Sequence, residues 1–389
     1  MDSLTQVALG GAVGYAVLGK QLGPKAALWG AAFGTLPDLD VFLPYGGEVE
    51  AFTYHRSFSH SFIVHLMVAP FFAWLLAKLH KRHNTELYVA EHGDTTQTPR
   101  IFGRFSRYEV KWFYLVFLCL STHALLDSCT VYGTQLFWPL TEYPVGISNL
   151  FIIDPLYTLP LLIGFVFALI PRLRYSLVKK ANAIGLILSS VYVLWSLGAK
   201  VYIDQKVEEA LAIKGIQAEQ FISTPAPFTT FLWRVVVMVE PSARASDAIG
   251  SMSAAKSEHY FEAYASILDT PEQISFDAYQ TDSSLIADIE SEWGVNRLKW
   301  FTKGFYAIKN EEDKVILSDL RMGVECSYVF NFTVGVKEND AIQLGDFEQV
   351  ANRPDFSKMQ YIWARIFDPN VSLAPHPPQG QCADPTQAN

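Results

Sequence analysis

Imidazole and carboxylate side chains recur in three short segments of this sequence, and together they could hold a divalent metal ion. The segments are TLPDLD (35–40), YHRSFSHS (54–61) and STHALLD (121–127). Histidine and aspartate four residues apart on a helix lie on one face and can reach the same ion. Imidazole and carboxylate ligands without thiolate are typical of Zn²⁺, and also of Mn²⁺ or Fe²⁺, in hydrolytic sites. We therefore predict a metal site, with zinc as the first choice, made from Asp38, Asp40, His55, His60, His123 and Asp127.

Such an ion would supply hydrolytic chemistry, because it lowers the pKa of a bound water toward ~7 and polarises a phosphoryl or carbonyl oxygen. The planar guanidinium of Arg56 matches the geometry of a phosphate, so we predict that Arg56 binds the substrate. A carboxylate left free of the ion, Asp38 or Asp40, would act as the base. Two other interpretations remain open: Asp38 and Asp40 cap a helix end, and His123 with Asp127 forms a satisfied polar pair.

Six apolar stretches must position these residues, and they predict a mainly α membrane domain, a polytopic bundle of about six helices. They run over about 4–19, 24–36, 61–79, 111–128, 154–170 and 181–203. The last four are long enough to cross a hydrocarbon core of ~30 Å. The first two are short and carry glycines four residues apart, which lets helices pack closely. We expect these two to form a tight helical hairpin, and a buried hairpin that does not span the membrane is the alternative. The glycines concerned are Gly10, Gly14, Gly30 and Gly34.

The distribution of Lys and Arg predicts which side of the membrane each connection faces. The connections 78–111 and 171–180 are rich in Lys and Arg, so we expect them in the cytoplasm. In contrast, 128–153 has neither residue and 37–60 has only Arg56, so both should face outward. The acids and histidines of the predicted site then converge on the outer membrane face. The start, MDSLTQ, lacks the basic region of a secretory signal, so we expect the first apolar stretch to be retained.

The second half of the chain predicts a soluble α+β domain outside the cytoplasm. Residues 1–203 carry a net charge of +3 and residues 204–389 a net charge of −12, and the total of −9 argues against nucleic acid as a partner. We divide the chain into a membrane domain (1–203), a soluble domain (204–375) and a polar tail (376–389). Cys326 and Cys382 could form a disulfide in that compartment. Strands are predicted at 228–241, 313–323, 326–336 and 359–367, and a short helix just after residue 203.

Two classes of function are consistent with this arrangement. One is a hydrolase of a phosphoester, with a lipid-linked phosphoester as the favoured substrate because the site opens at headgroup level. The other is a non-enzymatic membrane protein that carries or senses a divalent ion. The ionisable groups cluster at one membrane face with no chain of them across the bilayer, which favours the hydrolase. The sequence contains no H-E-x-x-H, G-x-S-x-G, Walker A or G-x-G-x-x-G motif, which argues against metalloproteases, serine hydrolases and NTPases.

Several segments resemble a known family over nearly the whole chain: MDSLTQ, LPDLD, HRSFSHS, HALLD, DPLYTLPLL, LWRVVV and KGFYA. They are similar to the bacterial membrane-bound metal-dependent hydrolases, a multi-pass inner-membrane family regulated by LexA and distantly similar to zinc-dependent phospholipases C and related nucleases. The resemblance implies metal ligands at Asp38 or Asp40, and at His55, His60, His123 and Asp127. The sequence departs from the family at Gln6, where members often carry histidine, so a metal ligand on the first helix is not expected.

Overall fold

The computed structural model describes residues 2–80, 100–101, 105–239, 258–338, 341–350 and 358–374. These residues form two compact units, and each is considered by itself. The first unit comprises residues 1–43, 54–147 and 152–195, and the second comprises 44–53, 148–151 and 196–389. The predicted tail 376–389, the residue Cys382 and most of the basic stretch 78–111 lie outside the described residues.

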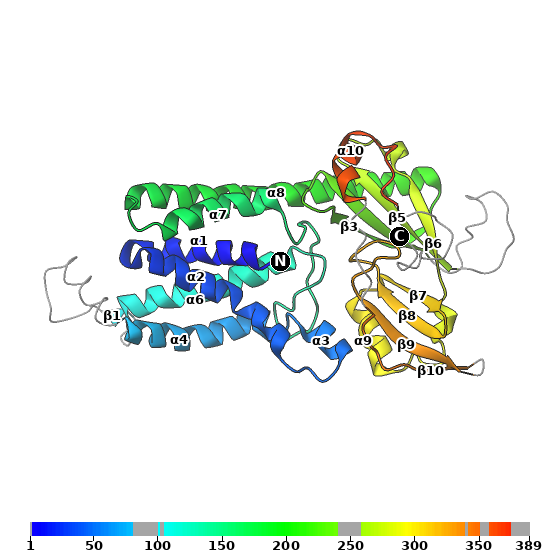
Figure 1. Cartoon of the computed structure of the whole chain (residues 1–389), viewed down its shortest axis with the longest axis horizontal. Helices are drawn as coiled ribbons and strands as arrows, with labels where there is room; N and C mark the ends of the chain where they lie inside the picture. The colour runs from blue at the N-terminus through cyan, green and yellow to red at the C-terminus, as the bar shows by residue number, and fades with distance from the viewer. Residues whose placement is uncertain are drawn as a thin grey trace, which may run out of the picture. The chain divides into compact units, whose positions relative to one another are not determined.

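The first unit is helical, and its helices lie side by side (Figure 1). Its elements are α1 (Ser3–Leu22), α2 (Pro24–Thr35), η1 (Pro37–Phe42), η2 (Phe58–His60), α4 (Phe62–Leu79), α6 (Arg107–Ser128), α7 (Pro155–Leu169) and the first part of α8 (Tyr175–Lys214). Two short strands, β1 (Arg100–Ile101) and β2 (Phe105–Ser106), pair just before α6.

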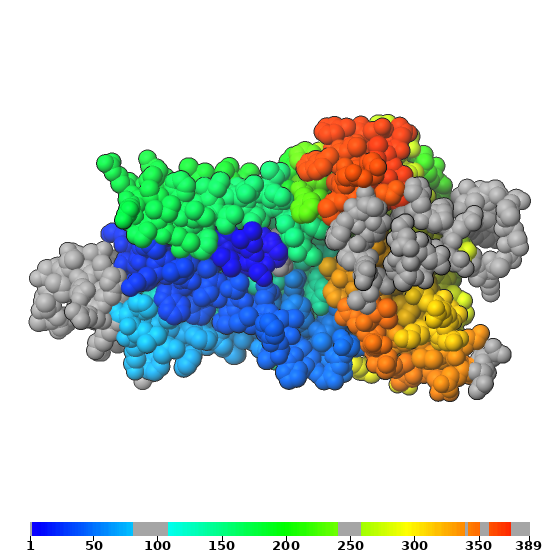
Figure 2. Space-filling model, in the orientation of Figure 1, coloured from blue at the N-terminus to red at the C-terminus, as the bar shows by residue number. Residues whose placement is uncertain are grey.

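Three helices among the described residues are long and apolar enough to cross a membrane: α4, α6 from Tyr108 onward, and α8. Helix α7 is a shorter apolar helix. Side chains of α4 and of the first part of α8 lie on the outside of the unit in the space-filling view (Figure 2), as expected for helices that contact lipid. The prediction of a helical membrane domain is therefore confirmed in outline, and the number of six spans stays a prediction.

Helices α1 and α2 form the predicted hairpin, which turns at Gly23, a residue with a positive φ of 57°. The two backbones approach so closely that only glycine fits. A Cβ on Gly30 would lie 2.2 Å from the carbonyl oxygen of Gly10 and 2.8 Å from the Cα of Gly14. The small residues seen in the sequence therefore position the start of α1 against the end of α2.

We expect Gly30→Ala to weaken the hairpin by about 1–3 kcal/mol, because the added methyl group must displace backbone atoms. Gly198→Ala in α8 is the matched control, because a Cβ there meets nothing within 4 Å. Alanine favours a helix over glycine by roughly 0.5–1 kcal/mol, so the control should be neutral or stabilising. Thermal unfolding in detergent measures both variants, and an unchanged Tm for Gly30→Ala would contradict the close approach.

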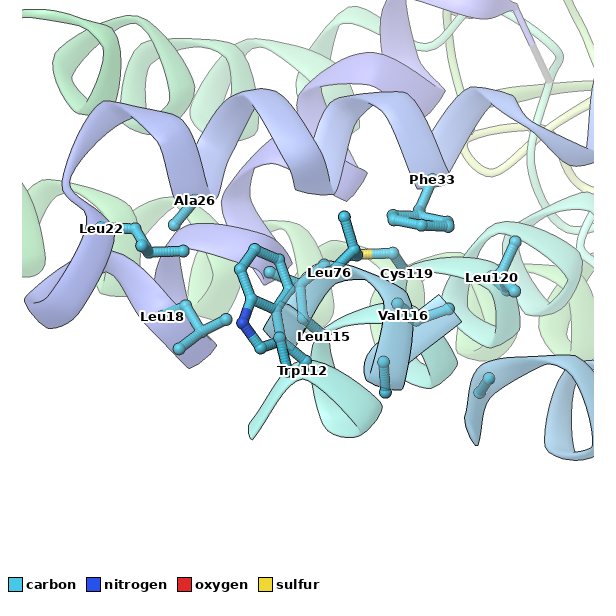
Figure 3. Close-up of a cluster of buried hydrophobic side chains, with 13 residues drawn as sticks. Leu18, Leu22, Ala26, Phe33, Leu76, Trp112, Leu115, Val116, Cys119 and Leu120 are labelled. Carbon is cyan, nitrogen blue, oxygen red and sulfur yellow. The ribbon is translucent and has the colours of Figure 1, made fainter. Parts of the chain in front are cut away.

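Around Trp112 of α6, apolar side chains from four helices form the main core of the first unit (Figure 3). The indole is fully buried among leucines of α1 and side chains of α2 and α4. This core packs α6 against the α1–α2 hairpin and against α4. The positions of the ends of these helices relative to one another are therefore fixed. The residues concerned include Leu18, Leu22, Ala26, Phe33, Leu76, Trp112, Leu115 and Val116.

The second unit contains two four-stranded antiparallel sheets. Their strand orders are β3-β4-β5-β6 and β10-β9-β8-β7. The strands are β3 (Ala218–Pro225), β4 (Leu232–Val239), β5 (Glu258–Ser266), β6 (Phe276–Thr281), β7 (Tyr306–Glu311), β8 (Lys314–Asp319), β9 (Asn331–Glu338) and β10 (Ala341–Leu344). Helices α3 (Glu48–Tyr54), α9 (Trp293–Phe301) and α10 (Ile362–Phe367) and the short turns η3 (Pro271–Gln273), η4 (Ser283–Ile286) and η5 (Met359–Tyr361) complete it.

One local prediction for this unit was wrong, and a second was right about the helix but not about its being a separate element. The stretch 359–367 is helical rather than a strand, because Ile362 and Ile366, four residues apart, are both buried against the same core. The short helix expected after residue 203 is the end of α8, which runs unbroken to Lys214. The prediction of a sheet-containing domain is confirmed. Cys326 is disulfide-bonded, and the predicted partner, Cys382, lies outside the described residues.

Candidate metal centre

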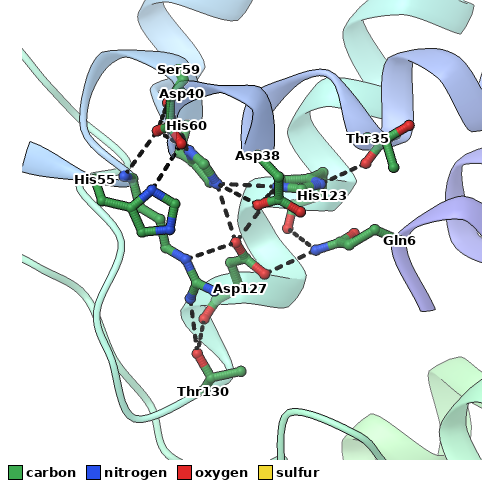
Figure 4. Close-up of polar contacts among 12 residues, drawn as sticks. Gln6, Thr35, Asp38, Asp40, His55, Ser59, His60, His123, Asp127 and Thr130 are labelled. Carbon is green, nitrogen blue, oxygen red and sulfur yellow. Dashed lines mark hydrogen bonds and ion pairs between the residues drawn. The ribbon is translucent and has the colours of Figure 1, made fainter. Parts of the chain in front are cut away.

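Four of the predicted ligands meet at one end of the helical unit. Proline at position 37 begins η1, which carries Asp38, and the turn η2 ends at His60 just before α4. His123 and Asp127 lie one turn apart near the end of α6. Each of the four residues offers a ligand atom, and these atoms all lie within 4.8 Å of one another. Segments about 20 and 60 residues apart in the sequence therefore converge, as predicted from the charge pattern (Figure 4).

Hydrogen bonds fix which nitrogen of each imidazole faces the centre. The Nδ1 of His123 lies 2.6 Å from the carbonyl oxygen of Gly34, which can only accept, so this nitrogen carries the proton. The hydroxyl of Ser59 donates to the Asp40 carboxylate and therefore accepts from the Nδ1 of His60, at 2.9 Å. In both rings the Nε2 atom is left with its lone pair directed at the centre. This is the arrangement of histidines that bind a metal through Nε2.

Five of the six distances among the ligand atoms are close to those around a tetrahedral ion, and the sixth, between Asp38 and Asp127, is within 4.8 Å. The two Nε2 atoms are 3.1 Å apart. The Oδ2 of Asp127 lies 3.2 Å from the Nε2 of His60 and 3.5 Å from that of His123. The Oδ1 of Asp38 lies 3.7 and 3.4 Å from the same two atoms. Four ligands about 2.0–2.1 Å from Zn²⁺ in a regular tetrahedron lie about 3.3–3.4 Å from one another, in the middle of this range.

Two imidazole lone pairs and two carboxylates repel one another at these distances, and Arg56, which pairs with Asp127, offsets only part of the negative charge, so a further positive charge is needed at the centre. Three of the four side chains are completely buried, which strengthens the repulsion. Burial raises the pKa of Asp38, but when the imidazoles carry protons in place of an ion, hydrogen bonds from His123 and His60 and the charge of His123 outweigh it and hold the pKa well below the usual range. Protons on the imidazoles or a divalent ion could supply this charge, and the near-tetrahedral spacing favours the ion.

Two further side chains hold Asp127 in place. The Nε of Arg56 forms an ion pair with Asp127 Oδ2 at 3.2 Å, and the amide of Gln6 donates to Oδ1 at 2.9 Å. Sequence reasoning missed this role of Gln6 and treated the residue only as a departure from a family pattern. The polar run MDSLTQ ahead of an apolar helix was the available signal, because a buried glutamine needs a polar partner.

Arg56 has a strained backbone that several contacts maintain. Its φ is 64°, in the left-handed region that non-glycine residues rarely adopt. Its backbone N–H donates to Asp40 at 3.1 Å and its carbonyl accepts from the backbone N–H of Gln135 at 2.9 Å. The guanidinium donates through Nη1 to Thr130 and lies 5.0 Å from the centre of the Tyr132 ring. Strain that the surroundings impose on a charged residue is a common feature of functional sites.

Asp40 and His55, the other two predicted ligands, lie beside the four-residue group and pair with each other. The Nδ1 of His55 donates to Asp40 at 2.8 Å, and the same carboxylate accepts from Arg56 and Ser59. Burial raises the pKa of Asp40, but the hydrogen bond and charge of His55 outweigh it and lower the pKa. The His55 ring is 23% exposed, and no described residue bonds its Nε2. Asp40 thus organises the loop that carries His55, Arg56 and Ser59.

The family comparison agrees with a membrane location. Residues 1–207, which include every residue of the site, match the family model described as YdjM inner membrane protein. No curated protein and no solved structure matches the chain significantly. The matched region covers more than half of the sequence and contains the apolar helices that carry the ligands. The chain therefore belongs to the YdjM inner membrane protein family.

Proposed function

We propose that this protein is a membrane-bound metal-dependent hydrolase that cleaves a phosphoester. The observation that supports it best is the group formed by Asp38, His60, His123 and Asp127, whose ligand atoms all lie within 4.8 Å of one another. Hydrolytic sites of this kind use imidazole and carboxylate ligands, and the described ligand group contains no thiolate. We take zinc as the resident ion, with Mn²⁺ or Fe²⁺ as the alternatives. Such an ion would polarise a phosphoryl oxygen, and it would lower toward ~7 the pKa of a water that binds it as a fifth ligand on the open side, beside Asp38.

Within the group, Asp38 marks the open side of the site. Its side chain is 24% exposed, whereas those of His60, His123 and Asp127 are fully buried. A substrate phosphate therefore reaches the site past Asp38. Arg56 would bind this phosphate, because its Nη2 has no bond to any described residue while Nε and Nη1 fix the plane of the guanidinium.

For the proton acceptor, the geometry favours His55 over the carboxylates that the sequence suggested. Asp40 already accepts three hydrogen bonds and has no capacity for a substrate proton. The same carboxylate fixes the proton of His55 on Nδ1, which leaves Nε2 as a base beside the ligand group. In Figure 4 this Nε2 lies on the side of the ring that faces Asp127. A histidine held by a carboxylate is the usual form of a general base.

We expect His55→Ala to lower turnover by about 100-fold while leaving the metal content unchanged, because a positioned base contributes roughly 10²–10⁴-fold. Hydrolysis of bis-p-nitrophenyl phosphate and elemental analysis of the same preparation measure the two effects. Loss of the metal together with turnover would instead make His55 a ligand, as the sequence alone predicted.

In this proposal the site and the second unit both face away from the cytoplasm. The connections that flank the ligands lack Lys and Arg apart from Arg56, whereas 171–180 is basic. The disulfide at Cys326 supports the same orientation, because disulfides persist in oxidising compartments. Cysteines introduced at Thr141, which is exposed in the connection after α6, and at Thr95 test the topology when they are labelled from each side of the membrane. Label should reach Thr141 from outside and Thr95 from the cytoplasm.

The hydrolase proposal is tested on the full chain purified in detergent without chelators. Metal content is measured first, and hydrolysis of bis-p-nitrophenyl phosphate and of phospholipids is then followed before and after treatment with EDTA. We expect turnover that EDTA abolishes and Zn²⁺ restores. A stably bound ion with no turnover of any phosphoester would favour the alternative, a carrier or sensor of divalent ions, and would contradict the hydrolase.

A further inference from the structure

Large apolar side chains surround the open side of the metal centre. The 3-10 helix η1 carries Asp38, and its neighbours on the same segment are exposed, with Phe42 81% exposed. Contiguous exposed apolar surface of this kind marks an interaction site rather than an ordinary water-facing surface. The exposed residues of this segment are Leu36, Leu39, Val41, Phe42 and Leu43.

The loop that contains Phe137 and Trp138 is also apolar, and it packs against the start of α4. The rings of Phe62 and Phe137 lie 6.0 Å apart, and those of Phe58 and Trp138 lie 6.3 Å apart. The hydroxyl of Ser61, which caps α4, donates to the carbonyl of Trp138. The loop held in this way exposes Phe137 and also Leu140, which is 82% exposed. We call the exposed residues of η1 and this loop the apolar rim: Leu36, Leu39, Val41, Phe42, Leu43, Phe137 and Leu140.

The ends of the candidate spans place the rim at the boundary between hydrocarbon and headgroups. Helix α4 has 18 residues, a length of ~27 Å that matches a hydrocarbon core of ~30 Å. It begins at Phe62, two residues after the ligand His60, and α6 ends at Ser128, one residue after the ligand Asp127. The ligands therefore lie where both spans end. Lipid phosphates lie at this same level, directly outside the hydrocarbon core.

We infer that the apolar rim inserts into the adjoining lipid leaflet, and that the metal centre takes its phosphoester from a membrane lipid rather than from water. This inference rests on the proposed hydrolase function, and to the lipid-linked substrate favoured from the sequence it adds the route of entry and the residues that provide it. The occupant of the rim is the bilayer, because Phe137 of the rim packs on Phe62 at the start of α4, whose Leu66, Met67 and Phe71 are exposed as on a lipid-facing helix. The single partly exposed ligand, Asp38, lies between Leu36 and Leu39, so a headgroup phosphate beside the rim is already at the opening.

Photocrosslinking tests the insertion without any need for activity. The photoreactive residue p-benzoylphenylalanine replaces Phe42 in the full chain, which is then reconstituted in vesicles that contain an alkyne-tagged phosphatidylethanolamine. Phe367 in α10, 75% exposed, is the matched control. Irradiation should transfer the lipid tag at position 42 at least ten times more efficiently than at position 367. Equal transfer at the two positions, or none at position 42, would overturn the inference.

The lipid as substrate is tested by comparing two substrates in one variant. Phe42→Ser should lower hydrolysis of vesicle phospholipid by at least 10-fold while hydrolysis of soluble bis-p-nitrophenyl phosphate stays within twofold, because Phe42 touches none of the ligands. Phe367→Ser should change neither rate. A parent protein that cleaves the soluble diester but not vesicle lipid would overturn the inference and leave the hydrolase in place. A parent that cleaves neither would contradict the hydrolase, and crosslinking would still decide whether the rim contacts lipid.

Discussion

Replacing His123 by alanine is expected to empty the metal centre and abolish turnover. His123 contributes one of two imidazole nitrogens, and its Nε2 lies within 3.5 Å of the other three ligand atoms. Removing a side chain that only hydrogen-bonds a metal ligand already costs roughly 10–100-fold in metal affinity or activity. Loss of the ligand itself should exceed this, so we expect more than 100-fold weaker metal binding and turnover at the background rate.

Elemental analysis and hydrolysis of bis-p-nitrophenyl phosphate measure this result on one preparation. His259→Ala is the control, because His259 lies in strand β5 of the second unit, and this variant should keep both metal and turnover. The variant must also remain folded, which the Tm in detergent reports. A folded His123→Ala protein that retains its full metal content would show that His123 is not a ligand.

The second large effect is expected at Arg56. Arg56→Gly should lower kcat/KM for a phosphodiester by about 10²–10³-fold, the range found when one preorganised donor to a developing charge is removed. Glycine is the appropriate replacement because the backbone at this position has a φ of 64°, which glycine adopts freely. The fold of the loop should therefore be retained, whereas loss of the ion pair with the ligand Asp127 should weaken metal binding by roughly 10–100-fold.

Arg56→Lys separates charge from geometry. Lysine keeps the positive charge beside Asp127 but lacks the planar fork, so it should recover only part of the lost activity. The rates of the variants are compared at saturating Zn²⁺, so that a change in metal affinity does not affect the comparison. Activity of Arg56→Gly within twofold of the parent would exclude a role for Arg56 in binding the phosphate.

Charge counting and helix periodicity were sufficient to predict the convergence of His60, His123 and Asp127. The apolar stretches fix where the helices end, and the asymmetry of Lys and Arg predicts which ends share a membrane face. The spacing of four residues then places His123 and Asp127 on one side of α6. Each of these signals is local in the sequence, so no tertiary information was needed.

The different roles of Asp38, Asp40 and His55 could not be predicted in the same way. In a 3-10 helix, residues two apart point in different directions, so Asp38 faces the ligands while Asp40 faces the following loop. The positive φ at Arg56 then reverses the chain between His55 and His60. Neither the helix type nor this backbone reversal has a clear signature in the sequence, and both depend on contacts with distant residues such as Gln135.

The roles of Gln6 and Gly34 also depend on tertiary structure. The carbonyl of Gly34 orients His123, and the amide of Gln6 orients Asp127, because the α1–α2 hairpin packs against the end of α6. The glycine spacing predicted the hairpin, but it did not predict that the hairpin packs against the end of α6. In the second unit, the helix at 362–367 was missed because its apolar residues are too few to separate a short helix from a strand.

X-ray absorption at the metal edge of the purified parent protein tests the central claim most directly. The account predicts one divalent ion per chain, with a first shell of four nitrogen and oxygen atoms at about 2.0–2.1 Å and the outer-shell signal of two imidazoles. That signal should disappear in His60→Ala and His123→Ala. A protein without metal, or an ion bound by sulfur or by six oxygen atoms, would contradict the account.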